Sequence, residues 1–140
     1  MTTGELVSME ALARWQKSDG TFISPGEFIP LFESSGFITR FDMYIWKSVC
    51  KTLAAWRDKG CKLVPISINV SMIDITNIDV PQYLSMLTEQ YHISPEYLPV
   101  EITESVFAES NTIVKNTITR FHKKGFYVLM DDFGSGIFFF

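Results

Sequence analysis

The sequence is poor in the features that mark several classes of protein. It has only two cysteines and two histidines in 140 residues, and no apolar run approaches the roughly 20 residues that span a membrane. The sequence has twelve lysines and arginines against sixteen aspartates and glutamates, a net charge of -4. It therefore has no excess of positive charge that would attract nucleic acid or an acidic membrane surface. Cys50 and Cys61 lack the spacing of a metal site or a disulfide framework. We therefore predict a soluble cytoplasmic protein with no nucleic-acid polymer and no membrane segment among its contacts.

The chain is rich in apolar residues, which predicts one domain with a buried core. Hydrophobic residues make up 46% and aromatic residues 14% of the sequence. Strand-like runs cover residues 6–12, 62–70, 98–103 and 126–130, with helical patterns between them; the first run also fits a helix. Strand, helix and strand in this order predict parallel pairing through crossover helices.

Polar side chains share one face of the predicted strands. Successive side chains alternate across a strand, so Asn69 points away from its apolar neighbours in the second strand, and Glu101 does the same in the third. Asp131 has the matching parity at the end of the fourth strand, and Glu10 takes the corresponding late position in the first. The carboxyl edge of a parallel sheet is where ligands bind. We expect these four oxygen-bearing side chains to meet there.

Hard oxygen donors in this pattern favour Mg²⁺, Mn²⁺ or Ca²⁺, and the absence of paired His or Cys disfavours zinc. Asp131 and Asp132 strengthen the hypothesis, because adjacent carboxylates repel and usually coexist with a cation or solvent. Any one of these carboxylates alone fits a solvated loop equally well. Arg14, four residues after Glu10, could bind a phosphate bidentately or be an ordinary surface arginine.

Five motifs in order extend these observations to a known family. The chain has EAL followed by Arg14 and Trp15, then PGEFIP, NVS, EITES and DDFGSG, beginning at residues 10, 25, 69, 101 and 131. This set resembles the EAL domain of bacterial cyclic-di-GMP phosphodiesterases. The resemblance covers nearly the whole chain.

The resemblance implies a variant TIM barrel that hydrolyses cyclic di-GMP to pGpG in second-messenger signalling, with two divalent cations, Mg²⁺ or Mn²⁺, as cofactors. It implies catalytic roles for Glu10, Asp131 and Asp132, a phosphate contact for Arg14, and for Glu104 a role in steadying the glycine loop. It also implies a set of metal ligands, with Asp132 on the second ion: Glu10, Asn69, Glu101, Asp131 and Asp132.

Only the first part of that barrel is expected here. The family's later Lys-Ile-Asp motif, a further glutamate ligand and a glutamine have no match, and a complete barrel needs about 250 residues. We therefore interpret residues 1–140 as a single truncated EAL domain: half of a TIM-like barrel, with about four parallel strands and crossover helices, ending after the fourth strand. We expect it not to hydrolyse cyclic di-GMP alone. The alternative is a degenerate, non-catalytic module that binds cyclic di-GMP or a protein. An open half-barrel exposes strand edges, which predicts a homodimer.

Overall fold

A computed structural model describes residues 4–103, 111–132 and 136–139 of the chain, and for residues 103, 111, 131–132 and 136–139 it describes the backbone. Its main feature is a five-stranded sheet in the order β1-β4-β5-β6-β7. The strands are β1 (Met9–Glu10), β4 (Ile66–Val70), β5 (Val100–Thr103), β6 (Val128–Asp132) and β7 (Gly136–Phe139). The first four pair in parallel, which confirms the predicted α/β architecture, and β7 pairs antiparallel with β6.

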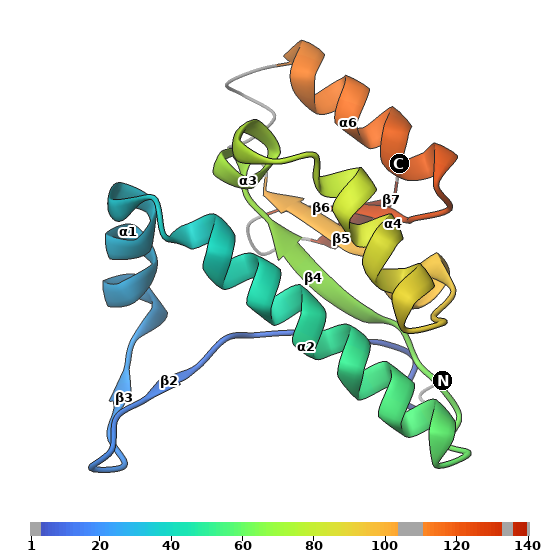
Figure 1. The fold of residues 1–140 in the computed structure, drawn as a ribbon, viewed down its shortest axis with the longest axis horizontal. Coiled ribbons are helices and arrows are strands. Elements are labelled where there is room, and N and C mark those ends of the chain that lie inside the picture. The colour runs from blue at the N-terminus through green and yellow to red at the C-terminus, as the bar shows by residue number, and fades with distance from the viewer. Residues whose placement is uncertain (1–3, 104–110, 133–135, 140) are drawn as a thin grey trace.

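Three long helices lie on one side of this sheet (Figure 1). They are α2 (Ile38–Asp58), α4 (Val80–Gln90) and α6 (Asn111–Lys123). Shorter elements are α1 (Pro25–Ser35), α3 (Met72–Asn77) and the 3-10 turn η1 (Pro95–Tyr97). Caps fix two of the starts as the sequence predicts, since the side chains of Ser24 and Asp79 accept backbone N–H groups of α1 and α4. The crossover order of strand and helix is what parallel pairing requires.

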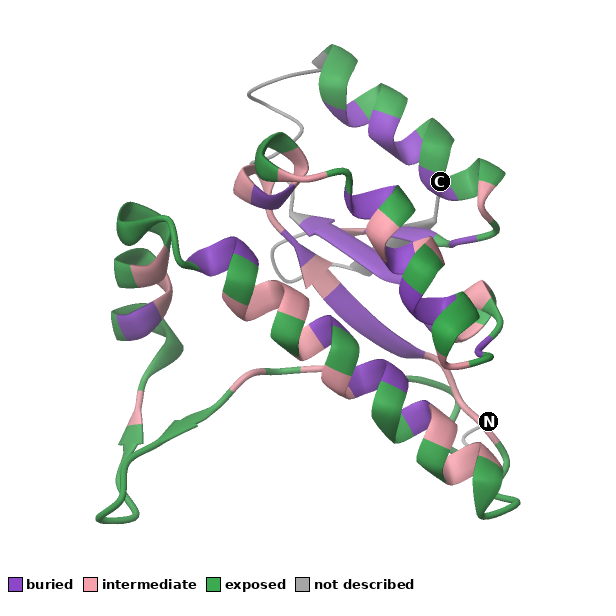
Figure 2. Cartoon of the chain, viewed as in Figure 1, coloured by how far each residue is buried: buried purple, intermediate pink, exposed green. Residues whose placement is uncertain are grey.

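The hydrophobic core lies between the sheet and these helices, where Figure 2 shows buried ribbon on both layers. Ile68 and Val100 of the central strands are fully buried, as are Leu53 of α2, Leu84 of α4 and Phe121 of α6. The apolar side chains of the strands therefore face the helices. The polar side chains that alternate with them lie on the opposite face, which is the face predicted to carry the site residues.

The N-terminal segment differs from the prediction in two respects. The first strand has only residues 9 and 10 in the sheet, and it pairs with β4 alone. After it, β2 (Trp15–Gln16) and β3 (Phe22–Ile23) form an antiparallel hairpin. Its turn is the expected one, with the Asp19 carboxylate accepting from the Thr21 N–H and Gly20 at φ 88°.

Two further elements were not expected. The six-residue helix α3 follows β4 directly, and β7 adds a strand beyond the four predicted. At β7 the chain runs back antiparallel to β6 without a crossover helix. The partial-barrel prediction therefore holds for β1, β4, β5 and β6, and β7 is an addition to it.

Removing a side chain from the core will destabilise the fold. Leu84 is fully buried, so Leu84→Ala is expected to lower the free energy of unfolding by about 2–5 kcal/mol through lost burial and the cavity left behind. Leu31, with 59% of its surface exposed, is the matched control, and Leu31→Ala should cost less than about 0.5 kcal/mol. Urea unfolding measures both. Equal losses would show that the helix-to-sheet core is misplaced.

Candidate metal and phosphate site

The strand register brings the polar residues of neighbouring strands level with one another. Asn69 of β4 is the pairing partner of Glu101 of β5, and Thr103 of β5 is the partner of Asp131 of β6. Glu10 of β1 pairs with Ser67, two residues before Asn69. Paired residues project to the same face of a sheet. The register thus places Glu10, Asn69 and Glu101 on one face, at neighbouring positions.

Glu10 and Asn69 are in direct contact. The Asn69 amide Nδ2 lies 3.4 Å from Glu10 Oε1, across the β1–β4 pair. The backbone of Asn69 is held from the other side of the sheet, where the Trp46 indole Nε1 of α2 donates to its carbonyl oxygen at 3.0 Å. Trp46 is almost fully buried. A core residue thus fixes the strand position from which the Asn69 side chain projects.

Glu101 is the buried carboxylate of the site, with only 6% of its surface exposed. The Ser67 hydroxyl donates to Glu101 Oε1 at 2.9 Å, and Ser67 is equally buried. A cavity of about 150 Å³ is lined by both residues together with Glu10. A buried carboxylate is costly unless it is hydrogen-bonded or close to a cation, and the Ser67 hydroxyl supplies one such bond.

Arg14 lies beside this cluster. It lines a separate cavity of about 260 Å³ together with Asn69, Asp42 and Phe28. Its guanidinium is exposed and donates to the carbonyl of Ala13 at 2.8 Å, which leaves other N–H groups available. An arginine next to a cluster of oxygen donors is suited to hold an anionic group near them.

Three of the predicted site residues cannot be placed to the level of side chains. Asp131 and Asp132 are described by their backbone, at the end of β6, and Glu104 lies outside the described residues. Among the side chains that the structure describes, no group of three or more His, Cys, Asp or Glu is arranged to hold a metal. The cluster seen there is two carboxylates, one amide and one hydroxyl.

The chemistry of this donor set suits a hard divalent cation. Carboxylate and amide oxygens are the ligands of Mg²⁺ and Mn²⁺ in proteins. Glu10 and Glu101 line one cavity on the same face, so a cation between them would offset their mutual repulsion. The backbone of Asp131 lies next to that of Thr103, at the same end of the sheet. The residues present therefore fit such an ion.

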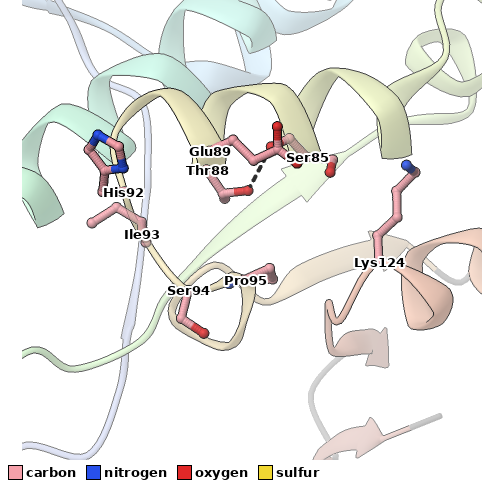
Figure 3. A pocket seen from close by; sticks show the side chains of 8 residues that line it. All are labelled: Ser85, Thr88, Glu89, His92, Ile93, Ser94, Pro95 and Lys124. Carbon is pink, nitrogen blue, oxygen red and sulfur yellow. Dashed lines mark hydrogen bonds between the residues drawn. The ribbon is translucent and has the colours of Figure 1, made fainter.

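A third cavity, of about 590 Å³, lies away from this cluster (Figure 3). It is lined by the end of α4, the segment of residues 92–95 before β5, and Lys124 before β6. These segments precede their strands, so the cavity is at the amino edge of the sheet, on the helix side. His92 and Lys124 come from different elements and point to separate parts of it. It shares no residue with the predicted site.

Two supporting residues were not assigned roles from the sequence. Ser67 was placed by parity on the same face as Asn69, but its bond to Glu101 depends on the strand register. Trp46 is one of several apolar residues of α2, and its contact with the Asn69 carbonyl joins segments 23 residues apart. A serine on the polar parity of a strand, level with a carboxylate, is the signal that could have identified Ser67.

These features define a class of protein: an α/β chain of parallel strands whose carboxyl edge carries oxygen-bearing side chains, as in a parallel barrel. Residues 1–138 match the EAL domain family, and the chain belongs to that family.

Two curated relatives from Escherichia coli (strain K12) are similar over almost the entire chain. The probable cyclic di-GMP phosphodiesterase PdeB is 33% identical over 136 residues, which are 97% of this chain and 26% of that protein. The cyclic di-GMP phosphodiesterase PdeR is 34% identical over 135 residues, 95% of this chain and 20% of that protein. The chain thus spans only a minor part of the length of the curated relatives it matches.

Solved structures show the same fold. The EAL enzyme Bd1971 in its cAMP- and cyclic-di-GMP-bound form has a TM-score of 0.80 at 25% identity, covering 93% of this chain and 36% of that one. The FimX EAL domain of Xanthomonas citri, in complex with c-diGMP, has a TM-score of 0.81 at 18% identity. That match covers 94% of this chain and 51% of the FimX chain, and at this identity it supports the fold alone.

The bond from Ser67 to Glu101 generates a prediction about stability. Ser67→Ala removes a buried donor to a carboxylate, so the free energy of unfolding should fall by about 1–3 kcal/mol. Ser34→Ala is the matched control, since the Ser34 hydroxyl bonds the Leu31 carbonyl on the exposed surface of α1. Urea unfolding of both variants measures the difference. A Ser67→Ala variant as stable as Ser34→Ala would contradict the assigned contact.

Proposed function

We propose that residues 1–140 form the part of a cyclic-di-GMP phosphodiesterase that binds the substrate phosphate and divalent cations. The contact between Glu10 and Asn69, next to Glu101, is the observation that carries the proposal. The names of the relatives and the cyclic-di-GMP-bound EAL enzyme support the choice of ligand. In this proposal the domain acts in second-messenger signalling in the bacterial cytoplasm. Among the described residues, none of the helices combines the length and hydrophobicity needed to cross a bilayer.

Each predicted residue has a place in this proposal. Glu10, Asn69, Glu101 and Asp131 would hold one Mg²⁺ or Mn²⁺, and Asp132 would hold a second. A bound cation would supply Lewis-acid polarisation of the phosphodiester. Arg14 orients the anionic phosphate from its neighbouring cavity, and Ser67 and Trp46 keep Glu101 and Asn69 in position. Glu104 steadies the loop after β6.

Binding is tested by calorimetry with cyclic di-GMP in the presence of Mn²⁺. The wild type should bind, and Glu10→Ala should weaken binding at least about tenfold, because it removes a carboxylate that faces Asn69. Glu89→Ala, at the cavity on the amino edge of the sheet, is the matched control and should bind like the wild type. Equal affinity of Glu10→Ala and the wild type would overturn the proposed site.

Hydrolysis is a separate question, and we propose that residues 1–140 alone do not convert cyclic di-GMP to pGpG. The family resemblance puts further ligands on later strands that these residues do not include. A turnover assay with Mg²⁺ or Mn²⁺ should give equal, background rates for the wild type and Glu10→Ala. Turnover by the wild type that Glu10→Ala abolishes would show that the chain is an active enzyme. Binding without turnover would favour the non-catalytic module.

The exposed edge of the sheet supports a homodimer. β1 is the terminal strand of the sheet, and Leu6, Val7 and Leu12 beside it are all more than half exposed. An unpaired strand edge with apolar flanks favours pairing with another strand. A second copy of the chain, joined edge to edge, would cover these residues.

Light scattering tests the homodimer against the chain mass of 16.0 kDa. The wild type should have twice that mass, and Val7→Lys should shift it toward the monomer by placing a charge at the edge. Leu31→Lys on α1 is the control for a new surface charge and should leave the mass unchanged. A monodisperse wild-type monomer would exclude the edge-to-edge dimer.

A further inference from the structure

A carboxyl group interrupts the buried side of α2. Asp42 lies four residues after Ile38 and four before Trp46, and both of those apolar residues are almost fully buried. Residues spaced by four lie on one face of a helix. Asp42 is itself half-buried, and it lines the cavity that Arg14 and Asn69 also line. Aspartate is rarely placed there without a partner.

The partner is Asp74 of α3, which is fully buried. One of its carboxyl oxygens, Oδ2, accepts the Ser71 backbone N–H at 2.8 Å, and its own N–H donates to the Ser71 hydroxyl at 3.1 Å. This reciprocal capping box starts α3. The other oxygen, Oδ1, is buried and has no donor in the described part of the chain. A buried acceptor left without a donor is costly.

Asp42 and Asp74 lie on two helices, α2 and α3, that pack against each other. A second bond, from Asn77 Nδ2 to Thr39 Oγ1 at 3.1 Å, joins the same two helices. Burial, the charge of Asp74 and a hydrogen bond with Asp74 raise the pKa of Asp42 to about 9. Two ionised carboxylates have no proton to place between them, so a donor for Asp74 Oδ1 exists only when Asp42 is protonated.

We propose that Asp42 and Asp74 share one proton at neutral pH, and that the resulting O–H···O bond is a pH-sensitive clasp between α2 and α3. The protonated carboxyl of Asp42 donates to Asp74 Oδ1, while Asp74 Oδ2 keeps its bond to Ser71. The inference does not depend on the proposed phosphodiesterase function, since neither group is among the predicted ligands.

The surroundings of Asp42 favour retention of the proton. Glu33 of α1 is a further negative charge near Asp42, and it raises the pKa of Asp42 in the same direction as Asp74. The cation that shares the cavity with Asp42 is Arg14, whose guanidinium is exposed and bonded to the Ala13 carbonyl. When the proton is lost at alkaline pH, two buried negative charges face each other. The clasp between α2 and α3 then opens.

The sign of the stability effect follows from the raised pKa. In the unfolded chain Asp42 ionises near its ordinary value of 3.8, whereas the folded chain keeps the proton until about pH 9. Between these values the folded state binds one more proton at Asp42, so the contribution of Asp42 to stability is greatest at low pH and falls as the pH rises. One such proton changes the unfolding equilibrium constant by about tenfold per pH unit.

Titration of the aspartate carboxyl carbons by NMR tests the clasp in the wild-type chain. One aspartate carbon should titrate near pH 9, far above the others, and its signal should be absent from Asp42→Asn. Asp58→Asn, an exposed aspartate on the same helix, is the control and should retain it. If every aspartate of the wild type titrates below about pH 6, the shared proton does not exist.

Urea unfolding at pH 6 and pH 8 provides a second readout. The amide introduced by Asp42→Asn can donate to Asp74 Oδ1 at every pH. In this variant the unfolding equilibrium constant should therefore lose the part of its pH dependence that comes from Asp42, about tenfold per pH unit. Asp58→Asn should keep the wild-type dependence. Identical pH dependence in the wild type and Asp42→Asn would overturn the proposal.

Discussion

Parallel pairing between β4 and β5 is the interaction on which the site depends. The register that sets Ile68 opposite Val100 also sets Asn69 opposite Glu101. Because side chains alternate along each strand, burying the apolar pair under the helices obliges the polar pair to lie on the other face. A slip of one residue would exchange the two sets. The core and the candidate site are therefore specified by the same backbone hydrogen bonds.

The helices stabilise this register by packing on the apolar face of the sheet, and one of them also contacts the backbone of a residue whose side chain lies on the polar face. Leu53, Leu84 and Phe121, one from each long helix, are fully buried against the strands. Trp46 adds a hydrogen bond, because its indole N–H donates to the backbone carbonyl of Asn69. The side-chain amide of Asn69 in turn donates to Glu10. A residue of the candidate site is thus supported by the packed apolar layer, which is the arrangement that keeps a site in its geometry.

Much of this arrangement could be predicted from the sequence, because alternation and helical spacing are local. The shared face of Asn69 and Glu101 follows from the apolar residues on either side of each. The first strand was predicted too long, since only Met9 and Glu10 of residues 6–12 pair with β4. Helix α3 is too short to show a hydrophobic period, although the spacing of Ser71 and Asp74 is that of a capping box.

Other features could not be predicted from local patterns. Strand β7 returns without a crossover helix, against the alternation of strand and helix in the rest of the chain. The proposed bond between Asp42 and Asp74 joins residues on two helices, so it could not be predicted from a spacing along the chain. The signal available in advance was a carboxylate on the apolar side of a helical pattern.

The central claim is that Glu10, Asn69 and Glu101 form one cation-binding edge. Paramagnetic broadening of NMR signals by substoichiometric Mn²⁺ tests it most directly, since the effect falls steeply with distance from the ion. The account predicts that signals from residues 10, 69 and 101 broaden first, while those of residues 88–95 at the amino edge of the sheet stay sharp. Broadening centred on the amino edge, or spread evenly over surface carboxylates, would contradict it.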